Sequence, residues 1–130
     1  MGLIERRMMQ ELKDKTLPER EAEIAEICGA RIPYDVDWDS LADDAEALRF
    51  VDNVSCHRLN MALRVICMDA MGREAVAGTV KRVRLVNVAE PAQMALSFAD
   101  GTLEMRCAYR HGAQGMHSDG AIRQLLEQSL

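Results

Sequence analysis

The sequence predicts an α+β fold in which helices and strands occupy separate stretches of the chain. Three observations lead to this class. Apolar residues recur at helical spacing in residues 3–28 and again in residues 41–72. From residue 80 to residue 109 they alternate with polar residues, as in strands. The expected order is an N-terminal helical hairpin, one edge strand, central helices, a three-stranded antiparallel meander and a C-terminal helix.

Length and composition indicate one globular domain. The chain has 130 residues, of which 48% are hydrophobic, so we expect residues 1–130 to form a single unit with a sizeable core. No apolar run approaches the roughly 20 residues of a membrane helix. The first ten residues, MGLIERRMMQ, carry charges where a signal peptide needs its apolar centre. We therefore expect a cytoplasmic protein that does not bind membranes.

Residues 1–29 are expected to form the helical hairpin and to be a candidate oligomerisation element. The first helix has one apolar stripe, made of Ile4, Met8 and Leu12. Thr16 and Glu19 then have the spacing of a capping box, in which each side chain accepts from the backbone amide of the other, so a second helix should begin there. Gly29 should end it, because glycine commonly terminates helices.

The segment DVDWDSLADDAE resembles an EF-hand calcium loop in its acidic spacing. Its carboxylates fall at the ligand positions of such a loop: Asp35, Asp37, Asp39, Asp43 and Glu46. An EF-hand also needs an incoming helix and a glycine at the sixth position, but Pro33 precedes the segment and Ser40 occupies that position. Pro33 has no amide hydrogen to donate, which favours an edge strand here. Ser40 should then cap a helix that starts at Leu41, so we expect no calcium site.

The stretch 54–71, VSCHRLNMALRVICMDAM, predicts a long helix with apolar residues on two sides. Its broad stripe contains Cys56, Leu59, Leu63, Ile66, Cys67 and Ala70; the second stripe contains Met61, Val65 and Met68. Such a helix is either central to the core or shared with a partner. Gly72 is expected to end it.

The meander strands are expected in VKRVRLVNV, MALSFA and TLEMRCAY, with Asp100 and Gly101 as a tight hairpin turn. In the last of these strands four apolar residues alternate with polar or small ones, namely Leu103, Met105, Cys107 and Tyr109. Ser118 or Asp119 should cap the C-terminal helix.

The four cysteines, Cys28, Cys56, Cys67 and Cys107, form no C-x-x-C motif and are expected to be buried free thiols. Cys56 beside His57 suggests a nucleophile and its base, but neighbouring helical residues point about 100° apart, so we expect no catalytic pair. Cys56 and Cys67 lie eleven residues apart, roughly 16 Å along a helix, which excludes a shared metal ion or disulfide.

The net charge of −5 is unevenly distributed. Residues 1–50 hold 13 acidic and 7 basic residues, whereas residues 51–130 hold 8 acidic and 9 basic residues. A nucleic-acid-binding protein usually has a basic face. Here only VKRVR clusters, without interleaved aromatic residues. We expect no nucleic-acid partner.

One loop is the candidate site. Residues 110–119 contain His111 and His117, which with Cys107 and Asp119 could supply metal ligands, although the spacing matches no established zinc motif and we expect no metal. The alternative is an anion-binding or partner-binding patch, made of Arg82, Arg84, Arg110, His111 and His117.

No P-loop, G-x-S-x-G, G-x-G-x-x-G or H-E-x-x-H motif is present. We therefore predict a non-enzymatic, small acidic protein-binding module of the adaptor, chaperone or immunity-protein kind, with no cofactor and no catalytic residue. The nine methionines fit this prediction, because methionine surfaces adapt to partners. We expect a homodimer, formed through the N-terminal helices or the long helix. The alternative is a small-molecule or anion-binding protein, or an enzyme, with a pocket near residues 110–119.

Overall fold

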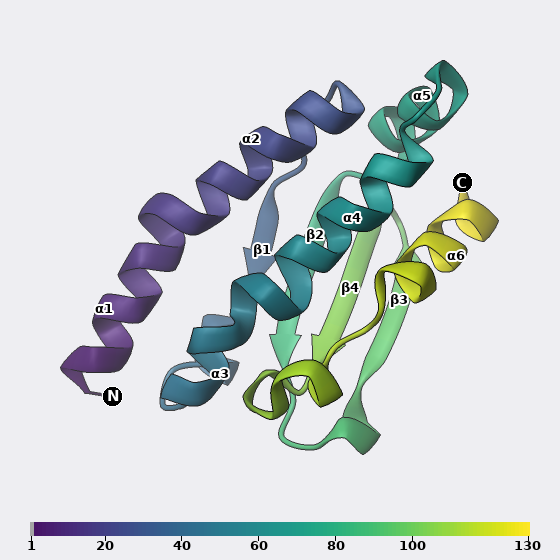
Figure 1. The fold of residues 1–130 in the computed structure, drawn as a ribbon. Helices are drawn as coiled ribbons and strands as arrows, with labels where there is room; N and C mark the ends of the chain where they lie inside the picture. The colour runs from purple at the N-terminus through teal and green to yellow at the C-terminus, as the bar shows by residue number, and fades with distance from the viewer. Residues whose placement is uncertain (1) are drawn as a thin grey trace.

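The computed structural model describes residues 2–130 and has the predicted α+β architecture, with helices packed on one face of a four-stranded sheet (Figure 1). The sheet has the order β1-β2-β4-β3. Its strands are β1 (Tyr34–Val36), β2 (Arg82–Asn87), β3 (Ala95–Ala99) and β4 (Thr102–Cys107). In the described residues, no helix is long and apolar enough to cross a membrane.

The two predicted N-terminal helices are present, but no turn separates them. Helix α1 (Leu3–Glu11) continues through a π-helical turn (Leu12–Thr16) into α2 (Leu17–Cys28), so the two run in one direction (Figure 1). Thr16 has helical dihedral angles and its side chain caps nothing. A π turn absorbs one extra residue within a helix. Hence the chain accommodates the T-L-P-E segment without the turn of a hairpin, and only the end at Gly29, with its φ of +76°, matches the prediction.

The central helices also join through a π turn. Helix α3 (Ala45–Val51) runs through Asp52–Cys56 into α4 (His57–Ile66). No turn therefore separates these two helices. Helix α5 (Ala70–Thr79) follows after a short turn.

Gly72 lies inside α5 and does not end a helix, contrary to the prediction. A Cβ atom at this position would lie 1.7 Å from the backbone oxygen of Ile66. The glycine is therefore needed for the close approach of α5 to the end of α4. Asp69 caps α5 by accepting a hydrogen bond from the amide of Gly72 at 2.7 Å.

The caps in the acidic segment differ from those predicted. Asp37 accepts from the amide of Ser40 at the start of a short 3-10 helix, and Asp44 accepts from the amide of Ala47 at the start of α3. Ser40 is not a helix cap: its hydroxyl donates to the carbonyl of Asp37 and accepts from the amide of Asn87. It thereby connects this segment to β2.

The strand pairing corrects the predicted meander. Strand β2 is parallel to both β1 and β4, and only β3 and β4 are antiparallel. A helical crossover links β1 to β2, which is the connection that parallel strands require. The link from β2 to β3 carries a 3-10 turn (Pro91–Gln93) and places β3 beyond β4. The edge position predicted for the first strand is confirmed, because β1 pairs only with β2.

The turn between β3 and β4 is the predicted tight hairpin. Asp100 and Gly101 both have positive φ, 51° and 77°, which suits the right-handed twist of the strands. Ser118 caps the C-terminal helix α6 (Asp119–Ser129) by accepting from the amide of Ala121. Inward-facing side chains of β2 and β4 are buried against the helices: Val83, Leu85, Leu103, Met105 and Cys107. Alternate residues such as Arg82 and Arg106 are exposed on the other face.

Candidate functional site

The predicted basic patch is divided between the two ends of the sheet. Arg82 begins β2, where its Nε donates to Thr102 Oγ1. The segment of residues 110–117 follows the end of β4, five positions further along the strands. At about 3.3 Å per residue this separates the two ends by roughly 16 Å. Arg82 therefore does not join the loop residues.

Arg84 is surrounded by carboxylates. Its guanidinium nitrogens lie 3.0 Å from Asp35, 3.9 Å from Asp37 and 3.7 Å from Glu104. Asp35 and Glu104 are the register partners of Arg84 on the two neighbouring strands, and Asp37 directly follows β1. The cation is locally compensated, so it offers little attraction to an external anion. The same contacts account for two acids of the EF-hand-like segment.

The loop residues are also engaged with their own chain. Arg110 pairs with Asp44 at 3.3 Å. The Nε2 atoms of His111 and His117 each donate to a backbone carbonyl, those of Ala89 and Arg106, both at 3.0 Å. These hydrogen bonds hold the two imidazoles at different segments. Within residues 2–130, no group of three or more His, Cys, Asp or Glu residues is placed to hold a metal ion.

Cys56, expected from the sequence to be a buried free thiol, is fully enclosed. Cys56 has no exposed surface, and burial raises the pKa of its thiol to about 12. Burial likewise raises the pKa of Cys107 to about 12. A thiol needs its thiolate form to act as a nucleophile or metal ligand. At neutral pH these two residues are small core side chains.

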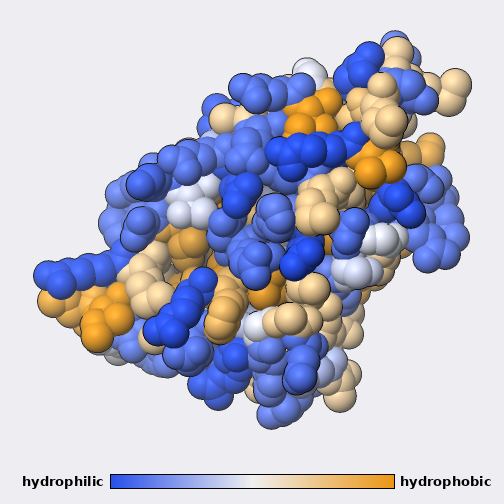
Figure 2. Space-filling view, in the orientation of Figure 1, coloured by the Kyte–Doolittle hydropathy of each residue, from blue (hydrophilic) through white to orange (hydrophobic). Residues whose placement is uncertain are grey.

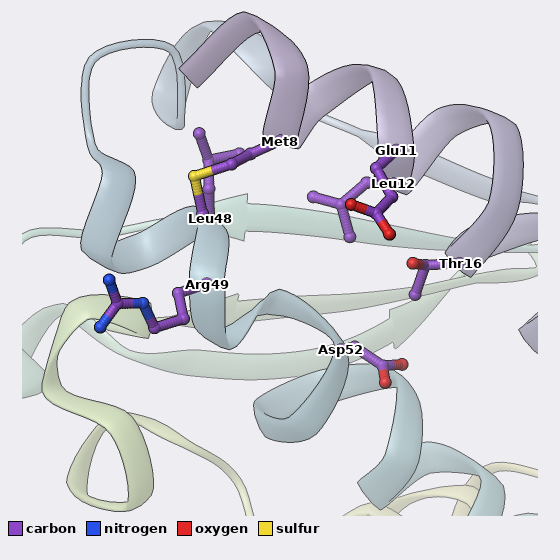
Figure 3. Close-up of a pocket in the computed structure, with 7 residues that line it drawn as sticks. All are labelled: Met8, Glu11, Leu12, Thr16, Leu48, Arg49 and Asp52. Carbon is purple, nitrogen blue, oxygen red and sulfur yellow. The ribbon is translucent and has the colours of Figure 1, made fainter. Parts of the chain in front are cut away.

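A first cavity of about 280 Å³ lies between α1 and α3 (Figure 3). The residues that line it are Met8, Glu11, Leu12, Thr16, Leu48, Arg49 and Asp52. Met8 and Leu48 point toward one another from the two helices, while the polar groups of Glu11, Thr16 and Asp52 lie further along (Figure 3). Both π turns contribute to this α1–α3 cavity, through Leu12 and Thr16 on one side and Asp52 on the other.

The acid at the edge of this cavity is held by a cation from α2. Arg20 Nε and Nη2 donate to the two carboxylate oxygens of Asp52 at 2.7 and 2.8 Å, and Arg20 Nη1 also contacts Glu23. The hydrogen bond and charge of Asp52 raise the pKa of Arg20 above its usual value. Asn60 donates to Glu23 at 3.1 Å. These hydrogen bonds connect α2 to the α3–α4 helix. The negative charge of Asp52 is neutralised by Arg20, so these polar groups stabilise the contact between the helices.

A second cavity of about 390 Å³ opens where α4, α5 and α6 meet. Its lining is Val65, Ile66, Asp69, Met71, Gly72, Ala75, Glu127 and Leu130. Most of these residues are apolar, and the carboxylates of Asp69 and Glu127 supply the charge. None of the sequence-predicted site residues lines this cavity or the first one.

Exposed apolar side chains occur at this second cavity and in the turn beside it. Val65 (41% exposed) and Met71 (79%) line the cavity, and Met68 (77%) lies in the turn between α4 and α5. Figure 2 shows orange and tan side chains over the end of α4 and over α5, at the upper right of the view. We call this region the α4–α5–α6 surface and define it by Val65, Ile66, Met68, Met71, Ala75 and Leu130. The other large exposed apolar side chains, Leu3 and Ile4, lie at the opposite end of the helical layer.

The sequence offered a partial signal for this surface. Val65 and Met68 belong to the second apolar stripe predicted for the long helix. Met71 lay in the predicted helix but in neither stripe, and Ala75 was out of reach because residues 73–79 carried no helix prediction. The cavity itself needs α6, which packs beside α4 only in the folded chain.

Comparison of the chain with protein-family models, with curated proteins and with solved structures finds no match in any of the three.

Proposed function

We propose that this protein is a non-catalytic protein-binding module and that the α4–α5–α6 surface is where it binds. The observation that carries the proposal is that the exposed Val65 and Met71 line a cavity of about 390 Å³, with the exposed Met68 between them in the sequence. Contiguous exposed apolar patches on globular proteins often mark interaction sites. Exposed methionines are flexible and polarizable, so they adapt their shape to a partner.

We further propose that a second copy of this chain occupies the surface. In a two-fold symmetric dimer the same surface is used twice, so each charge at its rim must meet an opposite charge of the other copy. The rim carries both signs: Asp69 and Glu127 are exposed acids that line the cavity, and Arg73 is an exposed base next to the lining residue Gly72 on α5. A rim of mixed sign is therefore self-complementary, which favours a homodimer over a uniformly basic or acidic partner.

The test is the molar mass in solution, measured by light scattering across a range of concentrations. The wild-type chain of 14.5 kDa should give twice that mass. Met68→Glu and Met71→Glu should each give the monomer mass, because burying an unpaired carboxylate at the interface is costly. Both side chains are more than three-quarters exposed, so these substitutions should leave the fold of the single chain intact.

Ile4→Glu is the matched control, because Ile4 is 67% exposed at the far end of the helical layer. It should remain a dimer. A wild-type monomer at high concentration would contradict the proposed second copy. Loss of the dimer in Ile4→Glu alone would place the interface at the N-terminal helix and contradict the proposed surface.

A further inference from the structure

Two cysteines that are distant in the sequence meet at the ends of two helices. Cys28 is the last residue of α2, and Cys67 follows the last residue of α4. Their sulfur atoms lie 3.0 Å apart. Of the four cysteines, all within the described residues, only these two have their sulfurs in contact. Both are free thiols.

From this contact we infer that Cys28 and Cys67 are a redox modification site that forms a reversible intrachain disulfide. A disulfide bond is about 2.05 Å long, so the sulfurs need to approach by about 1 Å. The local backbone is suited to such a movement, because α2 ends at Cys28 before Gly29, and α4 ends before the turn that leads to α5.

The environment of the pair differs from that of the other two cysteines. Cys67 is 5% exposed and Cys28 1%, whereas Cys56 and Cys107 have no exposed surface. Burial raises the pKa of Cys67, while its contact with Cys28 and the positive charge of Arg73 oppose that rise. The Arg73 side chain also donates to the carbonyl of Cys67 at 3.1 Å. Cys67 is therefore the thiol of the pair that a reagent reaches first.

The oxidant of the two thiols is a low-molecular-weight disulfide such as oxidised glutathione. The Cys67 thiolate attacks one sulfur of the reagent, breaks its sulfur–sulfur bond and releases one thiol. Burial and the contact with Cys67 raise the pKa of Cys28 well above its usual value, so Cys28 gives up its proton only as its sulfur, already in contact with Cys67, attacks the Cys67 sulfur and releases the second thiol. The two protein thiols are oxidised, the reagent is reduced to two thiols, and the two protons pass to the released thiolates.

The experiment treats the reduced full-length chain with oxidised glutathione and then blocks the remaining thiols under denaturing conditions. Two of the four thiols should become protected, with a loss of two hydrogens from the intact mass. Tryptic digestion should yield peptide 21–31 linked to peptide 65–73, and the link should disappear on reduction. The oxidised chain should melt about 10 °C higher, because the bond closes a long loop in the unfolded state.

Cys28→Ser should keep all remaining thiols free of any intrachain link, whereas Cys107→Ala should still form the disulfide, since it leaves the pair intact. If Cys28→Ser fails to fold, the peptide link in the wild-type chain still decides the matter. Four free thiols after oxidation would overturn the inference. So would glutathione retained on Cys67 alone, or a link that involves Cys56 or Cys107. The result is independent of the molar mass, so it can fail or succeed separately from the proposed dimer.

Discussion

The ion pair between Arg20 and Asp52 should be a main connection between α2 and the α3–α4 helix. The informative perturbation is a double-mutant cycle with Arg20→Met, which keeps the apolar stem, and Asp52→Asn, which keeps the shape of the acid. Each single variant removes the charge pair. The double variant shows how much of the loss belongs to the pair itself.

The magnitude follows from the geometry of the pair. The two guanidinium hydrogen bonds are short and parallel, at 2.7 and 2.8 Å, and the side chains are 22% and 33% exposed. A fully exposed pair contributes about 0–1 kcal/mol, and hydrogen bonds to charged groups contribute about 1.5–3 kcal/mol each when well shielded. Partial exposure places the expected coupling energy at about 2 kcal/mol. For a chain of this size each kcal/mol lowers the melting temperature by about 4 °C.

The assay is urea unfolding of the four proteins, with the free energy of unfolding taken from each curve. The matched control is the same cycle on Arg123 and Glu127, whose atoms are 3.8 Å apart and whose side chains are 44% and 55% exposed. That pair should couple by about 0.3 kcal/mol. A coupling between Arg20 and Asp52 no larger than that of the control pair would refute the reasoning.

Two further predictions concern backbone packing and pH. Gly72→Ala should destabilise the fold by about 2 kcal/mol or more, because its Cβ would meet the oxygen of Ile66 at 1.7 Å. Gly78 is in the same helix, and a Cβ added there would have nothing within 4 Å, so Gly78→Ala should stabilise the fold by about 0.5–1 kcal/mol. Thermal melts of the two variants measure both changes, and equal effects would contradict this account. Under reducing conditions the guanidinium chloride midpoint should fall between pH 9 and pH 11, because Cys56 and Cys107 have folded pKa values of about 12. Both values lie above the pKa of about 8.5 in the unfolded chain. The stability that the two buried thiols contribute is therefore fully present below pH 8.5 and is lost as the pH rises, by up to about 1.4 kcal/mol per pH unit for each thiol. A midpoint that does not change with pH would contradict the burial argument.

The elements that local chemistry controls were predictable from the sequence. The hairpin turn at Asp100 and Gly101, the cap at Ser118 and the end of α2 at Gly29 each depend on a few neighbouring residues. Those residues set the dihedral angles or satisfy the first free amides, so the pattern alone is sufficient. The inward side of β4 was equally readable, because alternation needs only one buried face.

Strand order and the π turns were not predictable in the same way. Alternation in β2 and β4 is the same whether β3 lies between them, as in a meander, or they pair directly as parallel strands. Their pairing depends on how the connecting segments pack. The T-L-P-E segment satisfies a capping rule, yet the helix continues through it. Tertiary packing of α1 and α2 against the central helices outweighs that local preference.

The features of the candidate sites also fall into two groups, those readable from the sequence and those that depend on the fold. The sequence by itself determined the class of fold, the burial of the cysteines and the second apolar stripe that becomes part of the α4–α5–α6 surface. Only the tertiary structure decided that Arg84 is compensated by three carboxylates, that α6 completes a cavity, and that Cys28 meets Cys67 across 39 positions. The physical reason is that periodicity assigns a side chain to a face, whereas contacts between distant residues depend on how whole elements pack.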